Sequence, residues 1–109
     1  MIELNVGAEW CSGPVMEART FSERMKGLRP RPSGRAMAFR AVSLHGFGMR
    51  EPLKVLCIGK DDVVRSVRTL RPRRILLDRE AKLMVEFPVE RELPQPGSRV
   101  SIVDTCLDP

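Results

Sequence analysis

Aromatic residues are scarce in this chain of 109 residues, which holds one Trp, four Phe and no Tyr. The core must therefore be built mainly from Val, Leu, Ile and Met. The longest apolar runs, residues 55–58 and 75–77, fall far short of the roughly 20 residues that a membrane-spanning helix needs. The N-terminus also lacks the basic head and apolar stretch of a signal peptide. We expect a cytoplasmic protein without a membrane span, exported only if a leader has been removed from this chain.

The chain has a single histidine and no closely spaced pair of cysteines, which excludes most metal sites. The only histidine is His45, and the three cysteines form no CxxC pair, so a zinc site has no ligand set. The carboxylates form no calcium-binding loop, and the chain contains neither a nucleophile elbow nor a phosphate loop. We therefore expect no metal, no cofactor and no catalytic residues.

The cysteines themselves are expected to be thiols. Cys57 lies inside an apolar run and is interpreted as a small core residue. Cys11 and Cys106 lie near opposite ends of the chain and could pair if the terminal strands are neighbours. In a reducing cytoplasm, free thiols are the expected state.

The remaining composition is that of an ordinary folded domain. Apolar residues make up 42% of the chain and charged residues 30%, which excludes a disordered protein. The length suits a single β-rich domain over residues 1–109, which we expect to be a monomer. The net charge of +5 favours solubility or an anionic partner.

Alternating apolar residues predict strands along most of the chain. Ser12, Gly13 and Pro14 are expected to interrupt the N-terminal pair, and a hairpin is predicted at the turn 59–62. A second pairing is predicted between residues 75–77 and 82–87. The expected strands cover residues 2–6, 15–18, 36–41, 42–49, 53–58, 63–70, 75–77, 82–87 and 100–103.

One short helix is predicted between the second and third of these strands. Thr20 and Glu23 have the spacing of a capping box, and apolar residues follow at helical intervals up to Leu28. Gly27 and Pro30 are expected to end the helix. The predicted fold is therefore mostly β with one short α-helix, in the form of an antiparallel β-sandwich or a distorted barrel.

The segment HGFGMREPLKV, residues 45–55, is the most unusual part of the sequence. Its two glycines do not continue into GxGxxG, which excludes a dinucleotide fingerprint. Glycine inside a strand more often permits close approach of another backbone or a ligand. Phe47 and Met49 are interpreted first as core side chains. For His45 a structural role, with its ring nitrogens bonded to nearby backbone, stands beside a ligand contact, while catalysis lacks an orienting acid.

Arginines form the strongest compositional signal. They fall into two clusters, which comprise Arg65, Arg68, Arg71, Arg73 and Arg74, and Arg24, Lys26, Arg29, Arg31 and Arg35. If both clusters lay on one face, they would attract phosphate groups. Against this, no aromatic residues are interleaved for base stacking, and strand alternation places Arg65 and Arg68 on opposite sides. A solvated surface and a nucleic-acid site both remain open.

The order of these motifs resembles the family of domain of unknown function number 192. The matching stretches are ERMKGL, AMAF, HGFGMREPLKVLCI, VVRSVRTLRP, VEFP and PGSRVSIV, and the resemblance covers residues 17–103. The resemblance implies a mostly β domain with one short helix and no established activity. Two positions depart from the family pattern, because Lys54 and Ser98 stand where relatives usually carry aspartate. A family site that used the acid at position 54 to orient His45 is therefore not expected here.

Two functions follow from these observations. The first is a non-catalytic binding or interaction module for an unknown protein or small molecule, with a site around the segment 45–50 and the arginines at 71–74. The second is binding of an anion or nucleic acid through the arginine clusters. The predicted site residues are His45, Phe47, Met49, Arg50, Arg71, Arg73 and Arg74.

Overall fold

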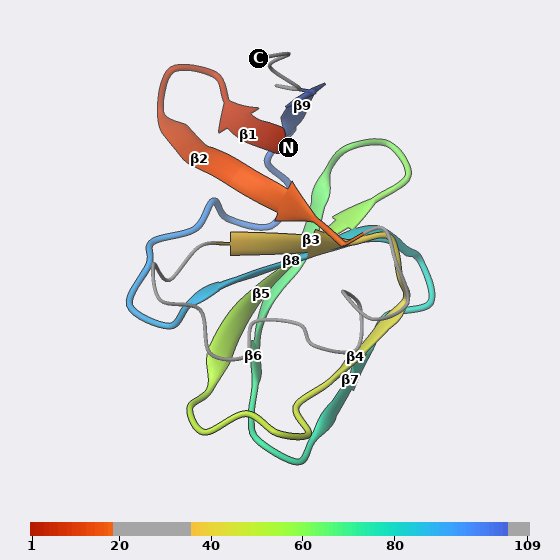
Figure 1. Ribbon diagram of the computed structural model, residues 1–109. Coiled ribbons are helices and arrows are strands. Elements are labelled where there is room, and N and C mark those ends of the chain that lie inside the picture. The colour runs from red at the N-terminus through yellow and green to blue at the C-terminus, as the bar shows by residue number, and fades with distance from the viewer. Residues whose placement is uncertain (19–35, 105–109) are drawn as a thin grey trace.

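The computed structural model describes residues 1–18 and 36–104, which form nine β-strands (Figure 1). The described residues contain no helix, and the predicted helix at residues 20–30 lies outside them, as does the arginine cluster of residues 24–35. The strands are β1 Ile2–Val6, β2 Trp10–Glu17, β3 Ala36–Phe39, β4 Ser43–His45, β5 Leu53–Gly59, β6 Val64–Leu70, β7 Ile75–Leu77, β8 Ala81–Pro88 and β9 Ser101–Asp104.

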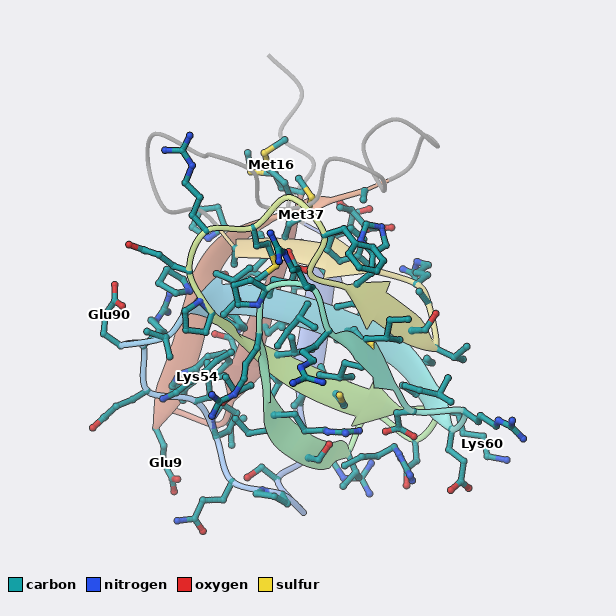
Figure 2. All side chains as sticks on the ribbon, turned by 90° about the horizontal axis from the view of Figure 1, so that it is seen from below. Glu9, Met16, Met37, Lys54, Lys60 and Glu90 are labelled. Carbon is teal, nitrogen blue, oxygen red and sulfur yellow. The ribbon has the colours of Figure 1, made fainter. Side chains whose placement is uncertain are left out.

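Seven strands form one curled sheet, a half-barrel with the order β6-β5-β8-β3-β2-β1-β9 (Figure 1). The mostly β prediction is confirmed, but the sheet is not purely antiparallel, because β2 and β3 run parallel. Parallel neighbours require a crossover of a dozen or more residues. Residues 18–35 separate these two strands and are numerous enough for one. The register places Met16 beside Met37, and Figure 2 shows the two side chains close together.

The central strands are buried on both faces. In β8, Leu83, Val85 and Phe87 belong to one apolar cluster, whereas Met84 belongs to a second, as the alternation predicted. All four residues of β3 are buried as well. Such continuous apolar strands are typical of a sheet that is covered on both sides. One face is enclosed by the curl of the sheet itself, and the other is covered by β4 and β7.

The predicted break in the N-terminal strand pair is wrong, because β2 runs without interruption through residues 12–14. The pairing of β1 with β2 shifts register between Glu3 and Asn5, and Gly13 adopts a positive φ of 72° at this irregularity. The hydroxyl of Ser12 accepts a hydrogen bond of 2.9 Å from the amide of Leu4. The serine side chain thus satisfies a backbone donor where the ladder is irregular, and the turn residues are accommodated inside the strand.

The hairpin of β5 and β6 is confirmed, but the predicted pairing of residues 75–77 with 82–87 is wrong. The short strand β7 pairs with β4, and β8 pairs with β5 and β3. A tight turn does follow β7, where the amide of Ala81 donates to the carbonyl of Asp78 at 3.1 Å. The chain uses this turn to pass from the two-stranded sheet of β4 and β7 into the seven-stranded one.

Candidate functional site

Strands β4 and β7 form a two-stranded antiparallel sheet, here called the ribbon, which covers one face of the curled sheet (Figure 1). Leu44 and Leu76 lie opposite each other and are buried in the second apolar cluster. Alternation along a strand directs the neighbouring side chains to the other side. The outer face of the ribbon therefore carries the cross-strand pairs Ser43–Leu77 and His45–Ile75.

The ribbon is bonded to the large sheet by two arginines of β6. Arg65 pairs with Asp78 at 2.8 Å and with Glu80 at 3.2 Å, and Arg68 donates to the carbonyl of Leu77 at 3.0 Å. The expectation that Arg65 and Arg68 face opposite sides is wrong. The register between β5 and β6 shifts at Arg65, and the extra residue of this bulge allows both side chains to reach the same end of β7.

Gly46 joins the ribbon to the loop of residues 71–74. Its amide donates to the carbonyl of Arg74 at 2.8 Å, and its carbonyl accepts from the amide of Arg73 at 3.0 Å. A Cβ at this position would lie 2.2 Å from the carbonyl oxygen of Arg71. The close approach that glycine permits here is therefore made by another backbone, and this contact brings two predicted parts of the site together.

The segment after His45 is a turn and not a continuation of the strand, so the predicted strand over residues 42–49 is too long. The amide of Met49 donates to the carbonyl of Gly46 at 3.2 Å, and Gly48 has a φ of 85°. Met49 packs against the second apolar cluster, as expected of a core side chain. The expectation for Phe47 is wrong, because its side chain is 51% exposed.

His45 lies against the ring of Phe47, with a centroid distance of 5.3 Å and an interplanar angle of 31°. Its Nδ1 is buried, and no group in residues 1–18 and 36–104 forms a hydrogen bond with it. The expectation that both ring nitrogens bond to nearby backbone is therefore wrong for Nδ1. His45 thus contacts the ring of Phe47, while its Nδ1 lies away from solvent.

The side chain of Lys54 lies on the face of β5 away from the ribbon, so an acid at this position would not reach His45. Its Nζ donates to the carbonyl of Arg91 at 2.9 Å, on the face of β5 that also carries Leu56 of the first cluster. The ribbon packs against the opposite face through its buried leucines. Figure 2 shows Lys54 at the opposite end of β5 from Lys60. Lys54 thus holds the loop after β8 in place.

The predicted arginines divide into those bonded to the ribbon or its flanking turn and those without an ion pair to the described residues. Whereas Arg65 and Arg68 bind the ribbon, the side chains of Arg71, Arg73 and Arg74 are exposed and form no ion pair with the described part of the chain. Arg50 is also exposed at the start of the connection to β5. Asp78 and Glu80, beyond the other end of β7, are paired with Arg65, and no described acid pairs with the arginines of residues 71–74.

Two apolar side chains beside these arginines were missed by the sequence reasoning. Ile75 is 68% exposed and Leu77 is 48% exposed, both on the outer face next to His45 and Ser43. Residues 75–77 were predicted only as a strand, without a role for these two side chains. The available signal was its shortness, because a three-residue strand on the surface can direct only its middle side chain, Leu76, into the core.

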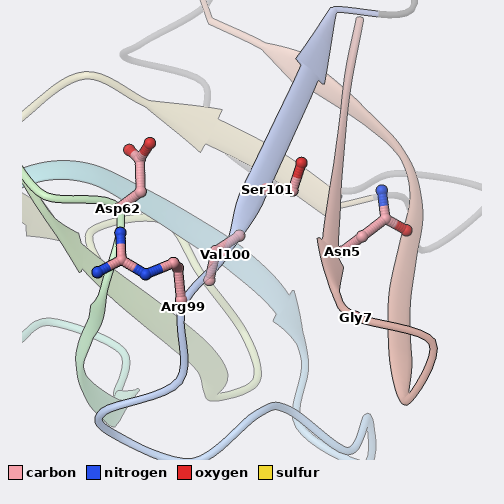
Figure 3. A pocket seen from close by; sticks show the side chains of 6 residues that line it. All are labelled: Asn5, Gly7, Asp62, Arg99, Val100 and Ser101. Carbon is pink, nitrogen blue, oxygen red and sulfur yellow. The ribbon is translucent and has the colours of Figure 1, made fainter.

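A separate hollow of about 460 Å³ lies near the ends of β1 and β9 (Figure 3). Within it, the carboxylate of Asp62 is already paired with the ammonium group of Lys82. None of the predicted site residues lines this hollow. Its lining residues are Asn5, Gly7, Asp62, Arg99, Val100 and Ser101.

The described residues offer little for metal binding or membrane insertion. Across residues 1–18 and 36–104, no group of three His, Cys, Asp or Glu side chains is placed to hold a metal ion. In the same part of the chain, no helix has the length and apolar character needed to cross a bilayer.

Glu86 is a buried carboxylate, 3% exposed, between Met37 and Val55 of the neighbouring strands.

Comparisons with known proteins identify two structures with the same fold and one sequence relative. No protein-family model matches the chain. The curled sheet is shared with the crystal structure of a candidate transcription regulator from Sinorhizobium meliloti 1021 (TM-score 0.69, 22% identity), which covers 92% of this chain and 90% of that one. It is also shared with a protein of unknown function from Novosphingobium aromaticivorans (TM-score 0.68, 18% identity, 92% and 82% coverage). A UPF0127 protein of Pyrococcus abyssi is 31% identical over 97 residues, covering 82% of each chain. The chain therefore belongs to the UPF0127 family.

Proposed function

We propose that this protein is a non-catalytic binding module whose site is the outer face and tip of the ribbon. The site comprises the predicted residues of the 45–50 segment and the arginines of the 71–74 loop, together with Ile75 and Leu77. The single observation that carries the proposal is the backbone contact of Gly46 with Arg71, which joins the two segments. The proposal is supported further by the exposure of Ile75 and Leu77, which follow the loop directly, and by the lack of ion pairs from its three arginines to the described residues.

The surface itself supports binding over catalysis. His45 has a ring neighbour and no carboxylate partner in the described part of the chain, so it lacks the group that would orient a general base. Exposed apolar side chains that adjoin one another are typical of interaction sites. We also propose that the module is a single domain over residues 1–109, acts as a monomer, and belongs to the family of domain of unknown function number 192, which the order of its motifs supports.

The test is a titration of ¹⁵N-labelled protein with three random decapeptide pools, one acidic, one basic and one neutral. Binding at the ribbon should shift the amide signals of Gly46, Gly48 and Ile75 more than those of residues around the separate hollow, such as Gly7 and Ser101. If every pool that binds shifts only the hollow, or if no pool shifts the ribbon, the proposed site is wrong.

A second candidate function is binding of an anion or a nucleic acid through Arg71, Arg73 and Arg74. It is favoured by their exposure and by the lack of ion pairs to them within the described residues. This function predicts that affinity for a single-stranded oligonucleotide falls steeply as salt concentration rises. Undetectable binding to the oligonucleotide at low salt would exclude it.

A further inference from the structure

The apolar part of the ribbon's outer face is a continuous strip. Ile75 lies directly across from His45, and the ring of Phe47 lies against His45, so both apolar side chains adjoin the histidine. Leu77 extends the strip by one further pair of residues. Phe47, Ile75 and Leu77 are all about half exposed or more. A surface of this kind gains free energy when an apolar group covers it.

The loop of residues 71–74, which leads into Ile75, carries charge of one sign. Arg71, Arg73 and Arg74 form no ion pairs with described residues, and the acids nearest the other end of β7 are paired with Arg65. The chain as a whole carries a net charge of +5. A second copy of the chain would bring the same guanidinium groups to a symmetric contact, which opposes self-association at this face.

The backbone of β4 adds a polar element. The carbonyl of Val42 accepts from the amide of Asp78, and the amide of Gly46 donates to the carbonyl of Arg74. The backbone polar groups of Val42 and Gly46 therefore point toward β7 and the residues that flank it. In an antiparallel ladder, the N–H and C=O groups of the alternating residues Ser43 and His45 then point away from β7. Lipid tails offer no hydrogen bonds to such groups, whereas a peptide does.

From these three properties, and resting on the proposed function, we propose that the ribbon binds an acidic peptide segment of a partner protein that carries an apolar anchor. The anchor covers the strip of Phe47, Ile75 and Leu77, and carboxylates next to it pair with the arginines of the 71–74 loop. Two of the three side chains of the strip are aliphatic, which favours a peptide over a nucleic acid. Protein surfaces that bind nucleic acids are more polar and use aromatic side chains to stack on bases.

The experiment measures the affinity of a fluorescent decapeptide in which two leucines are flanked by glutamates. Comparison peptides replace the leucines with serine or the glutamates with lysine. Two variants change the site, and each has a matched control. Arg74→Gln is compared with Arg79→Gln, which removes the same charge beyond the other end of β7, and Ile75→Thr is compared with Val103→Thr on β9, which is also exposed.

We expect Arg74→Gln to weaken binding about two- to fivefold, as one surface ion pair would. Ile75→Thr should weaken it roughly fivefold, as for an anchor contact. Both controls should bind like the original protein, and both comparison peptides should bind more weakly. Circular dichroism spectra that match across the variants exclude loss of folding as the cause.

Other outcomes would overturn the inference in distinguishable ways. If the lysine peptide binds at least as tightly and responds to Ile75→Thr, the ribbon is a binding site but the acidic partner is wrong. Tighter, ribbon-dependent binding to an oligonucleotide or to anionic vesicles, or dimerisation that Ile75→Thr abolishes, would replace the peptide with that occupant. If no probe responds to either site variant, both this inference and the proposed function are wrong.

Discussion

Replacement of Gly46 by alanine should destabilise the protein by about 2–3 kcal/mol. The new Cβ would lie 2.2 Å from the carbonyl oxygen of Arg71 and 3.2 Å from the Cα of Pro72. Because both neighbours are backbone atoms, they cannot rotate away, and the two segments must separate. Overpacking of this kind costs about 1–3 kcal/mol, and each backbone hydrogen bond that is lost costs about 1 kcal/mol. Separation of the segments relieves part of the strain, so the two costs do not add in full.

The assay is urea unfolding followed by the fluorescence of Trp10, the single tryptophan of the chain. With a urea dependence of about 1–2 kcal/mol per molar for a domain of this size, the midpoint of Gly46→Ala should fall by roughly 1–3 M with an unchanged slope. Gly59→Ala is the matched control, because its Cβ would meet only side-chain atoms of Arg65 and Asp61, at 3.2–3.3 Å. Equal midpoints for the two variants would refute the proposed role of Gly46.

Three further predictions concern groups that hold the site in place or report on its surroundings. The hydrogen bond from Arg65 holds the pKa of Asp78 below its ordinary value, so this pair stabilises the fold above the unfolded-state pKa and loses that contribution as the pH falls through the folded-state pKa. In Arg65→Gln the urea midpoint should therefore fall less steeply with pH between pH 6 and about pH 3 than in the original protein. The same pH dependence of the midpoint in both proteins would contradict this. Lys54→Met should cost about 1 kcal/mol through the lost bond to the carbonyl of Arg91, whereas an unchanged urea midpoint would show that this bond is dispensable. Burial raises the pKa of the Cys57 thiol, so peptide mass spectrometry should find it alkylated only after unfolding; rapid labelling of the native protein would contradict its burial.

Local patterns were sufficient to predict the features that depend on neighbours in sequence. The hairpin of β5 and β6 follows from two apolar runs around a polar turn, and the alternation in β8 assigns Leu83 and Met84 to opposite faces. The central segment 45–50 and the arginine loop 71–74 were also identified as parts of one candidate site. Their connection was not predictable, because it depends on the pairing of β4 with β7 across some 30 residues of sequence.

Several features that sequence reasoning missed depend on contacts between distant segments. The parallel pairing of β2 with β3 and the position of β7 on the ribbon depend on how the chain crosses between sheets. Arg65 illustrates the same limit at the level of one residue, because a bulge reverses the side on which simple alternation places it. The exposure of Ile75 likewise follows from where β7 is placed on the sheet, and an apolar residue in isolation does not indicate it.

The most direct test of the ribbon as a binding surface is the heat capacity change on binding of the leucine–glutamate peptide, measured by calorimetry at several temperatures. Burial of apolar surface gives a negative heat capacity change. If the anchor covers Ile75 and Phe47, the heat capacity change on binding should be negative in the original protein. Its magnitude should be clearly lower in Ile75→Thr and the same in Val103→Thr. An identical heat capacity change in all three proteins would contradict the account, because the peptide would then bind without covering the apolar strip.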